Sequence, residues 1–289
     1  MKQSENSKAV FLALITVVIW SGAYILTKIG LRYFYAFSLS VFRYLAGGAG
    51  MIILIVIHRD KPPAIRDVPY FFLLGLTGFT LYVLTFNYGA ETVTAATSSV
   101  IIAAAPVTTA IGASLFFGEK MNRRQVVATV VECIGVIIVC TWDGVLQMNA
   151  GVIWIVLAML CFTAYNLLAR YMSGKYSAMK MTEYSLLTAS ITFLFFTPAA
   201  LQRTHAYPLK GVIVVILMGI VCSGLAYVLW AEALKKAERT VTVSNMLFLE
   251  PAITSVLGYI FLKEVPSAGT VIGGILILAG LWYFSENET

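Results

Sequence analysis

Two stretches of the sequence decide the fold: AAAPVTTAIGASLFFGE at residues 103–119 and FLEPAITSVLGYIFLKE at residues 248–264. A constant offset of 145 residues places identical residues in register, within the stretches and just beyond them: Pro106 on Pro251, Phe116 on Phe261, Glu119 on Glu264 and Gly135 on Gly280. In each stretch the glutamate follows the proline by 13 residues. The match predicts that one structural unit occurs twice in the chain.

Both stretches lie in apolar segments long enough to cross a lipid bilayer. The 289 residues are 60% hydrophobic and 12% charged, with a mean hydropathy of +0.86, whereas a soluble domain is roughly 45–50% apolar and about 25% charged. A helix needs about 20 apolar residues to span the hydrocarbon. Segments of about this length predict ten spans, at residues 9–31, 36–57, 69–90, 94–117, 124–141, 150–169, 182–201, 211–233, 241–262 and 266–284.

Each copy of the repeated unit contains five spans. Because five is odd, the second copy must enter the membrane from the opposite side, and the two copies are related by a pseudo-twofold axis in the membrane plane. A weaker match near the two starts, with an offset of 142 residues, brings Lys28 onto Arg170 and Trp20 onto Phe162. The sequence therefore predicts an all-α membrane protein of ten transmembrane helices in two inverted five-helix repeats. The repeats cover residues 1–141 and 150–284, and residues 285–289 form a short cytoplasmic tail.

Lysine and arginine residues predict the orientation. One alternate set of loops holds 14 of them and the other set holds 5. Because cytoplasmic loops carry the excess of basic residues, we expect both termini in the cytoplasm of a multi-pass plasma (inner) membrane protein. The first 30 residues contain no small-residue cleavage site, so we expect a span and not a signal peptide. The net charge of +6 lies in these loops, which indicates the lipid bilayer and not nucleic acid as the partner.

Several motifs carry a resemblance to a known family: IWSGAYILTKIG in the first span, FRYL in the second, AAAP leading to FFGE in the fourth, and LFLEP leading to FLKE in the ninth. In this order and spacing, over essentially the full chain, the sequence resembles the EamA-type transporters of the drug/metabolite transporter superfamily. The resemblance implies ten helices in two inverted halves around a central cavity lined by spans 1, 3, 4, 6, 8 and 9. It implies no particular substrate, since family members move amino acids, nucleosides, sugars and other metabolites.

Ionisable residues inside spans are costly, at about 2.5–3.5 kcal/mol near a helix centre. Glu250 directly precedes Pro251, whose missing N–H frees a carbonyl for a cation, a proton or a polar solute. A purely structural hydrogen bond is an equally open interpretation of Glu250. We expect Arg43 to pair internally or to snorkel outward more readily than to clamp a substrate carboxylate. Glu132 is expected to pair at a helix or subunit contact, with a coupling-proton site as the alternative, and Lys28 to be interfacial.

Mid-span aromatic and polar side chains complete the candidate substrate site. Trp20 and Tyr24 are one helical turn apart and share a face. Rings on spans 1, 3, 6 and 8 are typical of a site for an aromatic or cationic solute, while lipid contact or packing is the alternative for any single ring. Small polar residues suit close helix packing, whereas asparagines are harder to explain in that way. The candidate substrate-binding residues are Trp20, Tyr24, Tyr82, Asn87, Tyr88, Ser98, Tyr165, Asn166, Tyr227, Trp230, Asn245 and Glu250.

Motifs of other protein classes are missing from the sequence. The two histidines, His58 and His205, fall in loops on opposite sides, and there is no Walker A, HExxH or GxSxG motif. We therefore expect no catalytic residues, metal or cofactor, and a membrane-embedded enzyme is an unlikely rival class. A channel is disfavoured as well, because nothing resembles a filter loop or a ring of charges.

The remaining class is a secondary transporter that moves a small molecule by alternating access. We expect export of an amino acid or related metabolite, coupled to a proton or to an exchanged solute. An uptake permease for a nucleoside or a cationic metabolite is the open alternative. Gly269 and Gly273 form a GxxxG motif in the tenth span, which is either a homodimer seam or an intramolecular packing site.

Overall fold

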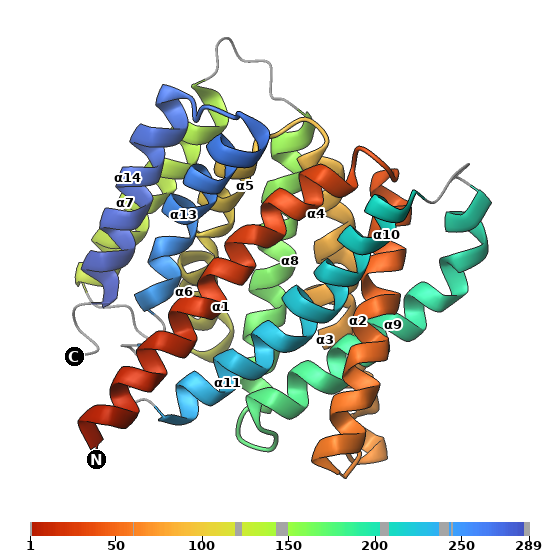
Figure 1. The fold of residues 1–289 in the computed structure, drawn as a ribbon. Helices are drawn as coiled ribbons and strands as arrows, with labels where there is room; N and C mark the ends of the chain where they lie inside the picture. The colour runs from red at the N-terminus through yellow and green to blue at the C-terminus, as the bar shows by residue number, and fades with distance from the viewer. Residues whose placement is uncertain are drawn as a thin grey trace.

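The computed structural model of the protein describes residues 2–59, 61–118, 123–142, 150–202, 208–236, 243 and 245–285, and all regular structure in these ranges is helical (Figure 1). The first half contains α1 (Lys2–Gly30), α2 (Ala36–His58), η1 (Ile65–Asp67), α3 (Val68–Gly75), η2 (Leu76–Leu81), α4 (Tyr82–Ala90), α5 (Ala95–Ile102), α6 (Ala105–Phe117) and α7 (Arg123–Thr141). The second half contains α8 (Ala150–Met172), α9 (Ala178–Gln202), α10 (Leu209–Ile216), η3 (Leu217–Leu225), α11 (Ala226–Lys236), η4 (Asn245–Leu249), α13 (Glu250–Leu257), η5 (Gly258–Leu262) and α14 (Ala268–Ser285).

Consecutive pieces join into ten helical spans in the described part of the chain. The third span is η1 with α3, η2 and α4, the fourth is α5 with α6, the eighth is α10 with η3 and α11, and the ninth is η4 with α13 and η5. Seven spans are long and apolar enough to cross a membrane, and three shorter apolar helices, Val126–Val139, Glu250–Leu262 and Ala268–Gly280, supply the fifth, ninth and tenth. The prediction of ten helices is confirmed.

The two halves are inverted relative to each other. Figure 1 shows that α1 and α8, the first helices of the halves, run in opposite directions, and that the start of α1 and the end of α14 lie at one end of the bundle. Helix packing follows the same symmetry. The second and fifth helices of one half pack on their counterparts in the other half, as α2 on α9 and α7 on α14. In addition, α1 packs on η3 and α11, and its counterpart α8 packs on η2 and α4. The prediction of two inverted repeats is confirmed. We call the end of the bundle where α1 terminates the upper end.

Two glycines make the symmetric close contacts between the halves. A Cβ atom on Gly75 would lie 2.5 Å from the carbonyl oxygen of Ser185, and a Cβ atom on Gly219 would lie 2.6 Å from the carbonyl oxygen of Arg43. Each contact joins the third span of one half to the second span of the other half. Small residues let helix backbones approach in this way, and the paired contacts place Arg43 and Ser185 at equivalent positions.

The fourth and ninth spans are interrupted at equivalent positions, beside Pro106 and Pro251. In the fourth span α5 ends at Ile102 and α6 begins at Ala105, with Pro106 in its first turn. In the ninth span η4 gives way to α13, with Glu250 and Pro251 in its first turn. Proline cannot donate a backbone hydrogen bond, so the helix restarts at this point. The break holds the carboxyl group of Glu250 at a helix start inside the membrane-spanning region.

Corresponding π-helical segments interrupt the third and eighth spans. These are η2 (Leu76–Leu81) and η3 (Leu217–Leu225), which occupy matching places in the two halves. A π-helical turn contains one residue more than an α-helical turn and is common at functional sites. The segments set the rotation of α4 and α11, which follow them and carry Tyr82, Tyr227 and Trp230.

The tight pairing of α7 with α14 uses the glycines of the tenth span. A Cβ atom on Gly269 would lie 2.1 Å from Cβ of Trp142, and a Cβ atom on Gly273 would lie 2.5 Å from a methyl carbon of Val139. The GxxxG motif therefore packs within the chain, and a homodimer stays a prediction without this support. Glu132 is fully buried on the same seam, and neither carboxyl oxygen has a hydrogen-bond partner among the described residues. The pairing expected for Glu132 is thus not observed there.

Candidate functional site

Trp20 is the centre of an aromatic contact between the first and eighth spans. Its ring centroid lies 5.3 Å from that of Tyr227 and 5.3 Å from that of Trp230. The indole N–H donates a hydrogen bond of 3.2 Å to the carbonyl oxygen of Cys222, within η3. The π-helical segment therefore both supplies the acceptor that fixes the Trp20 ring and sets the rotation of the two rings beside it.

Further rings continue this contact around the bundle. Neighbouring centroids lie between 5.4 and 6.2 Å apart along the series Tyr227, Phe79, Tyr165, Phe162, Tyr82, Phe86 and Tyr24. Ring pairs at such distances attract beyond their burial alone. We call these seven residues, with Trp20 and Trp230, the central aromatic cluster. It brings together spans 1, 3, 6 and 8, as the distribution of aromatic residues predicted.

Three phenylalanines of the cluster, Phe79, Phe86 and Phe162, were not predicted as site residues. Of these, Phe79 and Phe86 belong to the third span. They flank Tyr82 at spacings of three and four residues, so all three rings share one helix face. This spacing is the signal by which the sequence could have revealed them. Both phenylalanines are buried, whereas Tyr82 is only half-buried.

Glu250 joins the cluster from the ninth span. A hydrogen bond links its carboxyl group to the hydroxyl of Tyr24, and its carbonyl oxygen accepts a hydrogen bond of 3.3 Å from the hydroxyl of Ser21. Tyr24 is buried, while Glu250 retains partial exposure. The carboxyl group therefore lies at the meeting of α1, α13 and the aromatic rings, with a fixed donor on one side.

Arg43 of α2 lies near the same tyrosines. Its charge is within electrostatic range of the hydroxyl groups of Tyr24, Tyr82 and Tyr227, and its guanidinium carbon is 5.7 Å from the ring centroid of Tyr44. Only 9% of the residue is exposed, so the expected outward snorkelling is wrong. Among the described residues no ion pair involves Arg43, so the expected internal pairing with a carboxylate is absent as well.

The other predicted residues lie away from the cluster. Asn87 is buried, and its side-chain amide donates to the hydroxyl of Ser40 at 2.8 Å on α2. The ring centroid of Tyr88 lies 5.6 Å from that of Trp154. The hydroxyl of Ser98 donates a hydrogen bond of 2.8 Å to the carbonyl oxygen of Thr94. The side-chain amide of Asn166 donates one of 3.3 Å to the hydroxyl of Thr109. Asn87, Tyr88 and Asn166 thus contact neighbouring helices, whereas the hydrogen bond of Ser98 lies within its own helix. The side chain of Asn245, the repeat residue Glu119 and the tail residues 286–289 lie outside the described part of the chain.

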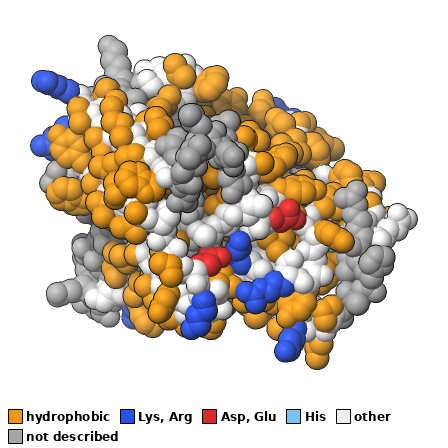
Figure 2. Space-filling model, turned by 90° about the horizontal axis from the view of Figure 1, so that it is seen from above, with side chains coloured by type: hydrophobic (Ala, Val, Ile, Leu, Met, Phe, Trp, Pro, Cys, Tyr) orange, Lys and Arg blue, Asp and Glu red, His pale blue; other side chains and the backbone are white. Residues whose placement is uncertain are grey.

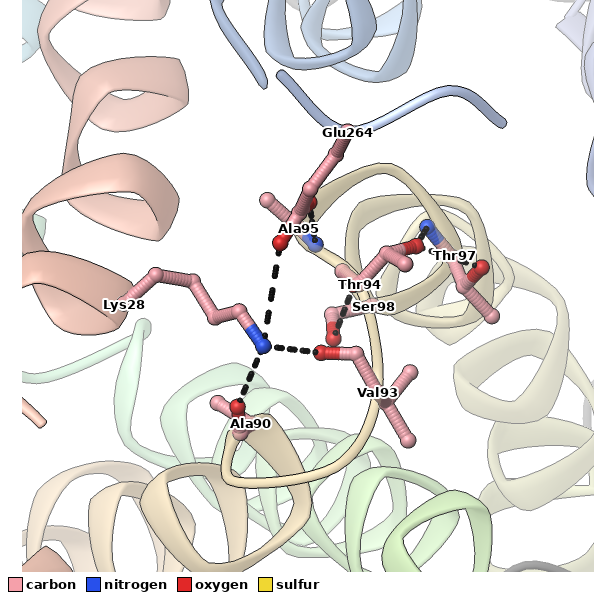
Figure 3. Close-up of polar contacts among 8 residues, drawn as sticks. All are labelled: Lys28, Ala90, Val93, Thr94, Ala95, Thr97, Ser98 and Glu264. Atoms are coloured by element: carbon pink, nitrogen blue, oxygen red, sulfur yellow. Dashed lines mark hydrogen bonds and ion pairs between the residues drawn. The ribbon is translucent and has the colours of Figure 1, made fainter. Parts of the chain in front are cut away.

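A polar network joins the end of α1 to two loops at the upper end of the bundle (Figure 3). The ammonium group of Lys28 donates to the carbonyl oxygens of Ala90 at 2.9 Å and Val93 at 3.0 Å, and its nitrogen lies 3.7 Å from Oε1 of Glu264. The other carboxylate oxygen accepts a hydrogen bond of 2.8 Å from the backbone N–H of Ala95 at the start of α5. We call these five residues the Lys28 network.

The Lys28 network is largely enclosed. The side chains of Lys28 and Glu264 are only 19% and 16% exposed, because the ammonium group is held by two carbonyl oxygens and a carboxylate. The interfacial position of Lys28 stays a prediction. Seen from above, acidic and basic side chains lie close together near the middle of this face, among apolar ones (Figure 2). The network ties the end of the first span to the loops after the third and ninth spans.

Two inverted bundles that meet around aromatic and charged side chains form the architecture of many membrane transporters. The profile of the EamA-like transporter family matches residues 7–141 and 149–285, and the chain belongs to this family. The family resemblance carried by the motifs is confirmed.

Relatives of known name are transporters too. The chain is 26% identical to the "Probable terminal-alkyne amino-acid exporter" of Streptantibioticus cattleyicolor, over 97% of this chain and 94% of that protein. It is 23% identical to the "Probable amino-acid metabolite efflux pump" of Salmonella typhimurium, over 94% and 93%, and 28% identical to an "Uncharacterized transporter" of Archaeoglobus fulgidus, over 98% and 99%. A solved crystal structure superposes with a TM-score of 0.66 at 15% identity, over 96% of this chain and 97% of that one. This last likeness shows the fold alone.

Proposed function

We propose that the protein is a secondary transporter that exports an amino acid or an amino-acid-derived metabolite across the plasma membrane by alternating access. The observation that carries the proposal is the position of Glu250 and the central aromatic cluster between two inverted halves. The names of the two relatives given above, an amino-acid exporter and an amino-acid metabolite efflux pump, support the cargo class and the direction.

The substrate site in this proposal is smaller than the set of residues predicted from the sequence. Aromatic faces attract apolar and cationic groups, and a carboxylate attracts an ammonium group. The proposed substrate contacts are Trp20, Tyr24, Tyr82, Tyr165, Tyr227, Trp230 and Glu250. Because Asn87, Tyr88 and Asn166 already have partners on neighbouring helices and Ser98 has one at the start of its own helix, we assign these four residues to the scaffold.

The Lys28 network supplies the closure of one face in this proposal. The upper end carries the basic-poor loops, which the positive-inside rule assigns to the periplasmic side. With Lys28 and Glu264 in contact, the first, third, fourth and ninth spans are tied together at that side. Release of substrate to the outside then requires these contacts to break, while both termini lie in the cytoplasm.

Counterflow in proteoliposomes tests the proposal. Vesicles loaded with one unlabelled L-amino acid at a time should take up the same labelled amino acid in a saturable way, with stimulation by the trans solute. Trp20→Ala and Glu250→Gln should reduce the initial rate at least about tenfold, since each removes a direct contact. Trp154→Ala is the matched control, because Trp154 lies outside the cluster and is 40% exposed.

The same vesicles discriminate the alternatives. Flux that does not saturate would indicate a channel, and counterflow of nucleosides or cationic metabolites without any amino acid would indicate the alternative cargo. Repeating the assay with and without a pH gradient identifies the coupling species as a proton or an exchanged solute. The export proposal fails if no amino acid supports counterflow, or if Trp20→Ala and Glu250→Gln retain the wild-type rate.

A further inference from the structure

Arg43 is a buried cation for which the described part of the chain provides no counter-ion. It lies seven residues into α2, about 10 Å from the start of the helix at a rise of 1.5 Å per residue. Only 9% of it is exposed, and its buried Nε atom has no hydrogen-bond partner. An arginine withdrawn from water in a membrane is costly unless an anion or a set of acceptors receives its donors. A ligand that brings such an acceptor accounts for this arrangement.

The charge of Arg43 faces the same groups as the charge of Glu250. Tyr24 and Tyr82 lie within electrostatic range of both residues, yet no ion pair joins Arg43 to Glu250 in the described part of the chain. The described residues therefore bring a cation and a carboxyl group near the same two tyrosines of the central aromatic cluster without an ion pair between them.

The duplicated fold does not require either charge. With the offset of 145 residues Glu250 falls on Ala105, and with the offset of 142 residues Arg43 falls on Ser185. The contacts of Gly75 with Ser185 and of Gly219 with Arg43 place the second pair at equivalent positions in space. Each half therefore packs with a small residue, Ala105 or Ser185, at a position where the other half has a charged one. We infer that the charges of Glu250 and Arg43 are not needed for helix packing and serve another role.

We propose that Arg43 binds the carboxylate of the substrate, while Glu250 and Tyr24 hold its ammonium group and the aromatic rings hold its side chain. The proposal rests on the proposed function and deepens it, because it names the substrate class as a zwitterionic α-amino acid with an apolar or aromatic side chain. The planar guanidinium group offers parallel N–H donors that match both oxygens of a carboxylate. Such a ligand neutralises both buried charges at once.

Matched pairs of ligands test the role of Arg43 directly. Each apolar and aromatic L-amino acid, beginning with L-phenylalanine, is paired with its own carboxamide, which keeps the ammonium group and side chain but has no carboxylate. Kd values are measured on purified full-length protein by isothermal titration. Wild type should bind the amino acid at least about 30-fold more tightly than the amide, as expected for a buried charge-assisted pair.

Arg43→Gln should lower the affinity for the amino acid and leave the affinity for the amide unchanged, so that the ratio approaches one. Retained amide binding shows that the variant is folded. Arg43→Lys keeps the charge without the parallel donors and should give an intermediate ratio. Arg32→Gln, an exposed arginine in the next loop towards the N-terminus, is the matched control and should keep the wild-type ratio.

A second set of titrations tests the role of Glu250 in binding the ammonium group. Glu250→Gln should weaken L-phenylalanine and L-phenylalaninamide by similar factors, because both carry the ammonium group, and should not weaken 3-phenylpropionate, which lacks it. The inference is overturned if wild type binds acid and amide equally, or if Arg43→Gln keeps the wild-type ratio. In either case amino-acid counterflow can persist, so the proposed function survives. Absence of both binding and counterflow for every amino acid overturns the function and the inference together.

Discussion

Replacing Glu264 by glutamine should open the upper end of the protein. The carboxylate oxygen is 3.7 Å from the nitrogen of Lys28, and unit charges at that distance attract by about 4 kcal/mol at an effective dielectric constant of about 20. Fully exposed pairs contribute only about 0.2–1 kcal/mol, and these side chains are 19% and 16% exposed. Glutamine also keeps an oxygen that accepts from the N–H of Ala95. We therefore expect a loss of about 1.5 kcal/mol from the closed state, or about tenfold in the ratio of closed to open protein.

The native thiol of Cys222 reports this change. It is 3% exposed and lies beside Trp20, so a charged, membrane-impermeant methanethiosulfonate added outside intact cells should reach it only when the upper end opens. In a background with the other three cysteines replaced by alanine, Glu264→Gln should be labelled about tenfold faster than the parent. Lys263→Gln is the control, because this exposed neighbour is not part of the network. Equal labelling rates for the two variants would refute the role of the Lys28 network in closing this face.

Three further substitutions have defined outcomes. Gly280→Ala should lower the free energy of unfolding by about 1–3 kcal/mol, since a Cβ atom there would lie 2.4 Å from Cγ of Glu132; an unchanged melting temperature in detergent would contradict this. Glu132→Leu should raise the melting temperature and preserve counterflow, because it removes a buried carboxyl group without a partner; loss of transport in a folded variant would indicate proton coupling instead. Tyr24→Phe should weaken amino-acid binding about 3- to 10-fold by removing one hydrogen bond to Glu250, and titration of the variant with L-phenylalanine checks this.

The sequence alone was sufficient for the architecture of this protein. Span length is set by bilayer thickness, and the two proline-containing stretches anchored the repeat, so ten helices in two inverted halves followed from hydropathy and from one offset. The aromatic cluster was largely predictable as well, because mid-span rings on the first, third, sixth and eighth spans have few other places to meet.

Side-chain partners inside the bundle were not predictable in the same way. Every face of such a helix is apolar, so its rotation about its own axis is set by packing and not by amphipathicity. Asn87 thus looked like a substrate contact but donates to Ser40 on a neighbouring helix. The partners of Lys28 could not be foreseen either, because the carbonyl oxygens of Ala90 and Val93 that hold it carry no signal in the sequence. Arg43 was expected to find an internal partner, yet no residue in the described ranges forms an ion pair with it.

The π-helical segment η3 gives this site an unusual route to new specificity. It precedes α11, and each residue of an α-helix adds about 100° of rotation. Deleting one residue from η3 would restore regular α-helix and turn Tyr227 and Trp230 of α11 by roughly that angle, away from Trp20. A single-codon deletion would therefore change which side chains of α11 face the site, without replacing any of the aromatic residues. Length changes in this segment are a place to look for divergence in cargo among relatives that keep the same aromatic residues.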